Sequence, residues 1–104
     1  MANQTAVRFG YPETLVREYD HWLVLLREPQ PTLGSLIQCA KSGATEFSAL
    51  SVKGLVLMGT VVRVFEQAMK SGFVYVYINY LLLMMVYPNV LFLVIPRYAE
   101  RRSA

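Results

Sequence analysis

An uncharged run at residues 71–96 constrains the fold of this chain more than any other feature of its sequence. The run is long enough to cross a bilayer as a helix, and Lys70 and Arg97 flank it. However, Tyr87-Pro88-Asn89 lies inside the run and is typical of a turn, because proline does not fit a helix interior. The residues before this turn are rich in Val, Ile and Tyr, which favour strands. We therefore expect a β-hairpin here and no membrane span.

The two arms of this hairpin are predicted at residues 73–85 and 90–95. Side chains alternate between the two faces of a strand, so the odd-numbered residues of an arm share one face and the even-numbered residues share the other. Both faces are apolar in both arms. We therefore expect the hairpin to lie centrally in a sheet that is covered on both sides.

Alternating apolar residues and turn signals also mark the first part of the chain. Three segments predict strands, at residues 14–19, 22–27 and 32–41. The first two are separated only by Asp20-His21, which predicts a tight antiparallel hairpin. With the later hairpin, these segments predict an α+β fold with an antiparallel sheet of about five strands, one long helix and a short helical turn.

The long helix is predicted at residues 52–70, after a helical turn at residues 46–50, with Ser51 as its N-cap. Its apolar residues fall into two rows. The first row is expected to pack on the sheet and contains Leu55, Met58, Val62, Phe65 and Met69. The second contains Leu57, Val61, Val64 and Ala68. A second row indicates another buried contact, either with a partner subunit or with a bound ligand, and a helix covered by its own chain is the alternative.

The composition predicts one domain with more apolar residues than its core requires. The chain has 104 residues, 55% of them hydrophobic and 16% charged, whereas about 25% are charged in an average domain. We expect a single domain at residues 1–104 whose ends, 1–8 and 99–104, are flexible. The net charge of +3 does not form a basic stripe interleaved with aromatic residues, so nucleic-acid binding is not predicted.

The single cysteine, Cys39, excludes an internal disulfide and favours a reduced, cytoplasmic location. It lies in an apolar run that is typical of a strand, with no acidic or imidazole residue close in sequence, which indicates a core residue rather than a nucleophile. The first residues, MANQTAVRFG, contain no apolar segment, so no secretory signal is expected.

The order of these segments resembles that of the histidine triad (HIT) family. The resemblance is carried by DHWLVLLREPQPTLGSL, the long helix, INYLLLMMVYP and finally VIPRY, and it covers about residues 9–98. It implies an α+β protein, usually a homodimer, that hydrolyses or transfers nucleotides. In that family three alternating histidines precede the segment that matches VIPRY, and the middle histidine is the nucleophile.

All three triad positions depart from the family pattern. Carried over by position, they fall on Asn89, Leu91 and Leu93, and the alkyl group of Leu91 cannot attack phosphorus. Asn79 matches an asparagine that the family commonly places near the phosphates. The only histidine of the chain, His21, lies at the predicted turn of the first hairpin and is expected to be solvated there. We therefore expect no enzymatic activity, and neither a cofactor nor a metal is predicted.

An apolar cleft with a few phenol and amide groups replaces the family's polar site in this interpretation. Such a cleft fits a bulky apolar molecule, because aliphatic walls supply affinity and a few polar groups direct the ligand. The predicted ligand-binding residues are Tyr75, Tyr77, Asn79, Leu81, Leu83, Tyr87, Asn89, Leu91 and Leu93. The pattern resembles engineered steroid binders, with a digoxigenin-type steroid as the ligand. The alternative is a natural HIT pseudoenzyme with residual nucleotide binding or a dimeric scaffolding role, and a homodimer is expected on the family resemblance.

Overall fold

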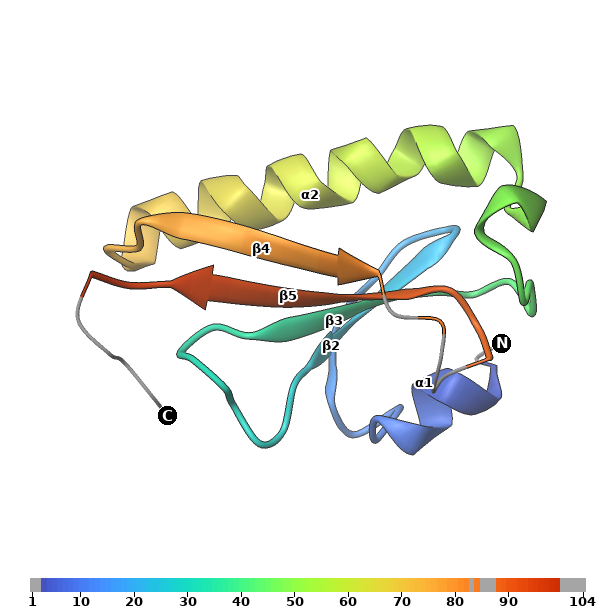
Figure 1. The fold of residues 1–104 in the computed structure, drawn as a ribbon, viewed down its shortest axis with the longest axis horizontal. Coiled ribbons are helices and arrows are strands. Elements are labelled where there is room, and N and C mark those ends of the chain that lie inside the picture. Colours follow the sequence, from blue (N-terminus) through green and yellow to red (C-terminus); the bar gives the residue numbers. More distant parts are fainter. Residues whose placement is uncertain (1–2, 83, 85–87, 100–104) are drawn as a thin grey trace.

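The computed structural model describes residues 3–82, 84 and 88–99. Within them the order is α1 (Gln4–Arg8), β1 (Leu15–Glu18), β2 (Trp22–Leu26), β3 (Leu36–Ala40), a 3₁₀ turn (Phe47–Ala49), α2 (Val52–Gly72), β4 (Tyr77–Leu82) and β5 (Leu91–Arg97). The strands form a five-stranded sheet in the order β1-β2-β3-β5-β4, and all neighbours are antiparallel (Figure 1). The predicted α+β class is confirmed, with its five-stranded sheet, one long helix and short helical turn.

The sheet separates two apolar clusters. One cluster lies under α2 and contains Trp22, Val24, Ala40, Leu50, Val61 and Val90. The other lies on the opposite face, where α1 covers it, and contains Ala6, Leu23, Leu25, Ile37, Cys39 and Leu91 (Figure 1). Alternate residues of β2 and β3 therefore point to different clusters, as the period of a strand requires. Cys39 is fully buried in the second cluster, so its assignment to the core is confirmed.

The long helix begins where the sequence predicts and ends two residues later. The side chain of Ser51 accepts a hydrogen bond from the backbone N–H of Gly54 and caps the first turn. Val61 and Met69 are its most buried side chains, so Val61 was wrongly assigned to the second, outer row. The apolar side of the helix therefore includes both rows, and the residues where the two rows meet face the sheet. No helix within the described ranges is long and apolar enough to cross a bilayer.

The first eight residues were expected to be flexible, but Gln4–Arg8 forms a helix whose Thr5 and Ala6 are fully buried. Asn3 explains its position. The Asn3 side-chain oxygen accepts a hydrogen bond from Ala6 N–H, and its amide nitrogen donates to the carbonyls of Ala40 and Ser42. A helix this short has no visible periodicity and depends on its cap and on tertiary packing, which the sequence pattern does not reveal. Of the other predicted end, residues 100–104 lie outside the described residues.

The uncharged run forms β4 and β5, although their places in the sheet differ. β5 lies between β3 and β4, so it is central as predicted, whereas β4 is an edge strand and not a covered one. β4 also begins at Tyr77 rather than at residue 73. The expectation of a central hairpin was wrong for β4. It is β5 that pairs with β3, so one edge of β4 has no neighbouring strand among the described residues. Residues 83 and 85 of the predicted arm lie outside the described residues.

Candidate functional site

Strand register brings several predicted site residues onto one face. Asn79 lies opposite Ile95, and Leu81 lies opposite Leu93, in the antiparallel pair of β4 and β5. Directly opposed residues share a face, so these side chains line the face turned away from α2. Leu91 lies on the same face, since it alternates with Leu93 along β5. The predicted alternation of this hairpin is therefore confirmed for Asn79, Leu81, Leu91 and Leu93.

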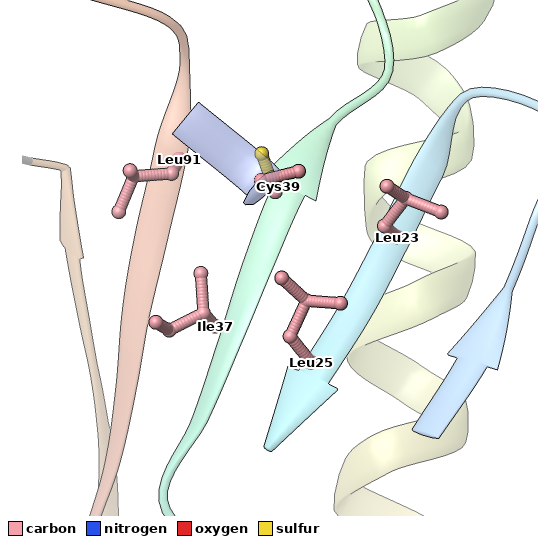
Figure 2. Packing of buried hydrophobic residues seen from close by; sticks show 6 residues of the cluster. Leu23, Leu25, Ile37, Cys39 and Leu91 are labelled. Carbon is pink, nitrogen blue, oxygen red and sulfur yellow. The ribbon is translucent and has the colours of Figure 1, made fainter. Parts of the chain in front are cut away.

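Leu91 is a core side chain with an exposed fraction of 0%. It belongs to the cluster that joins three neighbouring strands, where it lies beside Cys39 and Ile37 (Figure 2). Ala6 of α1 completes the same cluster. Leu93, two residues along β5, packs at the border of the cluster and is only partly buried. The first turn of the chain therefore covers one end of the predicted cleft, and a molecule on this face can reach Leu93 but not Leu91.

Asn89 is buried and holds three segments together. Its side-chain oxygen accepts a hydrogen bond of 2.8 Å from the Thr5 hydroxyl, and its amide nitrogen donates to the carbonyl of Gly43 at 3.2 Å. A further donor–acceptor distance of 3.5 Å joins that nitrogen to the carbonyl of Ala44. Since these bonds occupy the amide, Asn89 serves the packing of α1 and of the loop after β3 in this arrangement. Its predicted role in ligand binding stays a prediction.

The exposed part of this face lies on β4 and the neighbouring half of β5. We call Tyr77, Asn79, Leu81 and Leu93 the outer strip. Tyr77 is 65% exposed and Leu81 is 42% exposed, while the Asn79 amide nitrogen donates to the carbonyl of Ile95 at 3.2 Å. The strip offers alkyl groups, a phenol and an amide oxygen, which bind molecules by contact and by directed hydrogen bonds. It contains no side chain of the imidazole, thiol or carboxylate type that would relay a proton.

Tyr75 precedes β4, so the strand register does not place it on the outer strip, and its predicted role in ligand binding stays a prediction. Tyr80, within β4, alternates onto the α2 face. The Tyr80 hydroxyl donates a hydrogen bond of 2.6 Å to the carboxylate of Glu66 on α2. Burial, followed by this hydrogen bond to Glu66, raises the pKa of the Tyr80 phenol well above its ordinary value. Leu83 and Tyr87, the two remaining predicted residues, lie outside the described residues.

A separate hollow lies near the first hairpin, and several titratable residues line it. His21 lines it with Asp20, Lys41 and Ser51, and its volume is ≈ 280 Å³. The backbone carbonyl of His21 accepts a hydrogen bond from Lys41 N–H. Lys41 pairs with Glu18 at 2.5 Å, and this hydrogen bond holds the pKa of the Glu18 carboxyl below its usual range. Within the described residues, no three His, Cys, Asp or Glu side chains lie close enough together to hold a metal ion.

Sequence reasoning missed Gln38, a buried amide on β3. It faces α2 and lines a cavity between that helix and the sheet. The sequence does contain an indication of this amide. A glutamine interrupts the apolar run LIQCA, and its neighbours on either side along the strand are buried. The run was interpreted only as a strand, and the amide within it was given no role.

Comparisons with known proteins bear on the fold. No protein-family model matches the sequence, and no curated protein matches it either. Among solved structures, a zinc-bound histidine triad family protein from Mycobacterium smegmatis superposes with a TM-score of 0.70. The match covers 86% of this chain and 73% of that one, with 16% sequence identity. A hypothetical protein from Leishmania major superposes with a TM-score of 0.65 and 18% identity, over 86% of this chain and 67% of that one.

These likenesses establish a HIT-like fold for the chain. The identities are too low to carry activity or residue roles from either protein. The fold is therefore the firm result of the comparison, and it agrees with the fold that the order of segments around VIPRY implies.

Proposed function

We propose that this chain is a non-catalytic binding protein built on a HIT-like fold. One observation supports it above the others: the position that the resemblance assigns to the nucleophile carries Leu91, whose side chain is fully buried under α1. An alkyl group has no lone pair with which to attack phosphorus. Loss of the nucleophile alone normally removes many orders of magnitude in rate.

The ligand that we propose is a bulky, mainly apolar molecule bound on the outer strip, and a digoxigenin-type steroid is the specific candidate. Leu81 and Leu93 offer partly exposed alkyl surface, which favours apolar contact at about 25 cal/mol per Å² of area removed from water. The hydroxyl of Tyr77 and the amide oxygen of Asn79 lie on the same face and can each bond to a ligand oxygen or hydroxyl. The likeness to engineered steroid binders, in which tyrosines bond to the ligand and leucines cover its rings, supports the same choice.

Titration of a fluorescent digoxigenin conjugate tests this proposal. We expect saturable binding, weakened at least about tenfold by Leu81→Asp, because a charge in the contact must be desolvated. Tyr77→Phe should weaken binding by a smaller factor, typical of one hydrogen bond. Tyr80→Phe is the matched control, since Tyr80 lies on the α2 face and should leave the affinity unchanged. Absence of saturable binding, or equal affinity for the parent and the Leu81→Asp variant, would rule out the outer strip as a steroid site.

A dimeric scaffold is the second candidate, and the exposed edge of the sheet supports it. No other strand of the described residues pairs with the outer side of β4, and its Tyr77 and Leu81 are both exposed. Unpaired edges are natural sites for strand addition. Light scattering at micromolar concentration tests it: we expect the mass of a dimer, and Leu81→Lys should shift the mass towards that of a monomer. A monomeric parent would count against a scaffold. Residual nucleotide binding, the other part of this alternative, would appear as heat on titration with a nucleoside monophosphate.

A further inference from the structure

A cavity of ≈ 120 Å³ lies between α2 and the sheet, on the face opposite the outer strip. The described residues that line it are Gln38 of β3, Met58 and Val62 of α2, Tyr80 of β4 and Phe92 of β5. Four of these five side chains are apolar or aromatic. The hydroxyl of Tyr80 donates to Glu66, which braces β4 against α2 beside the cavity.

Gln38 is the polar exception, and its amide nitrogen has no hydrogen-bond partner among the described residues. Its exposed fraction is 3%, and its side-chain nitrogen forms no hydrogen bond with any described residue. In the sheet it lies between Val24 and Phe92, neither of which has a side-chain acceptor. Buried amide donors are almost always paired. A buried donor without a partner has given up its hydrogen bond to water and gained none in return, which costs free energy. Since no described residue supplies that acceptor, a bound molecule that carries one would satisfy the amide nitrogen.

We propose that this cavity binds a small, mainly apolar molecule carrying one carbonyl-type acceptor, to which the Gln38 amide donates. The volume suits a ligand of one six-membered ring, since an apolar protein cavity of about 150 Å³ binds benzene. Phe92 and Val62 offer flat and branched apolar walls, and Met58 adapts to the shape of the ligand. The carboxylate of Glu66 beside Tyr80 disfavours an anionic ligand. A steroid is too large for this volume, so the site is independent of the outer strip.

A matched pair of ligands tests the proposal on the unmodified protein. Cyclohexanone and methylenecyclohexane have nearly the same shape, but only the ketone has an acceptor. In ¹H–¹⁵N and methyl NMR spectra we expect cyclohexanone to shift the side-chain amide of Gln38 and the methyl groups of Met58 and Val62 in a saturable way. Methylenecyclohexane should shift the methyl groups with an affinity about tenfold weaker, the difference that one hydrogen bond makes.

Two variants separate the amide from the cavity. Gln38→Met keeps the length of the side chain and removes the donor, so both ligands should bind with equal affinity. Val62→Phe fills the cavity and should abolish binding of both, while its thermal unfolding verifies that it folds. Leu81→Asp, on the opposite face, should change neither affinity. The proposal is overturned if neither ligand gives saturable shifts at these residues, which would leave water as the partner of Gln38. It is also overturned if the unmodified protein binds both ligands equally, or if Gln38→Met keeps the tenfold preference.

Discussion

The hydroxyl of Thr5 donates a hydrogen bond to the side-chain oxygen of Asn89, 2.8 Å away, and both side chains are buried. Thr5 belongs to α1, whereas Asn89 directly precedes the segment that enters β5. The Asn89 amide also donates to the carbonyl of Gly43 in the loop after β3. One asparagine thus fixes the helix that covers Leu91, at a position where the family resemblance implies a catalytic histidine.

Replacing Thr5 by Val should destabilise the protein by about 1–3 kcal/mol, because the buried oxygen of Asn89 loses its donor while the shape of the side chain is kept. Thr5→Ser is the matched control and should cost less, since it keeps the hydroxyl. The free energy of unfolding in urea measures both. Equal stability of Thr5→Val and the parent would mean that the bond contributes nothing to the position of α1.

Leu91→Ala and Leu81→Ala make the same chemical change at two positions on the sheet face turned away from α2. We expect Leu91→Ala to cost about 2–5 kcal/mol, because it leaves a cavity in a fully buried cluster. Leu81→Ala should cost less than about 1 kcal/mol, because 42% of that side chain is already in solvent. Chemical denaturation of the two variants gives the comparison. Similar losses would show that Leu81 is covered in solution, as a dimer through β4 would require.

Placing histidine at the three positions that the resemblance assigns to the triad should not produce a nucleotide hydrolase. A histidine in place of Leu91 would lie in the cluster under α1, where a phosphate has no access, and its surroundings would remain apolar. The assay is release of a chromogenic leaving group from a nucleotide, with circular dichroism to verify folding of the Asn89→His, Leu91→His, Leu93→His variant. Turnover above the uncatalysed rate would mean that α1 moves away readily and that the polar site survives.

The thiol of Cys39 predicts a loss of stability at alkaline pH. Burial raises its pKa from 9.0 to about 11. The pKa of the thiol is therefore higher in the folded protein than in the unfolded chain. Its contribution to the free energy of unfolding is fully present below pH 9 and is lost as the pH rises towards 11. The loss should reach about 2 kcal/mol by pH 11.

Unfolding curves of the parent and of Cys39→Ala at pH 8 and above isolate this contribution from that of other alkaline groups. The parent should lose more stability with rising pH than the variant does. Equal losses of stability in the parent and in Cys39→Ala would contradict the assignment of this pH dependence to Cys39. In addition, a thiol reagent at pH 8 should modify Cys39 only after the protein unfolds, because the sulfur is buried.

Local patterns were sufficient for most of the elements. The turn at Pro88 and the strand-forming residues on either side of it predicted a hairpin, and Ser51 predicted the start of α2, because caps and turns depend on neighbours in sequence. Alternation predicted that Asn79, Leu81 and Leu93 share a face. It says nothing firm of Tyr75, which precedes β4, since alternation holds only where the backbone is extended and paired.

The sequence by itself determined the fold class and the face that Asn79, Leu81 and Leu93 share, because residue type and strand period are local properties. Only the tertiary structure decided that α1 covers Leu91, that β4 is an edge strand, and that the Gln38 amide nitrogen has no partner among the described residues. Each of these depends on contacts between distant segments, such as Thr5 with Asn89, whose separation of 84 residues leaves no periodic trace in the sequence. The order of strands and the packing of α1 follow from the total burial of apolar surface, which is a property of the whole chain.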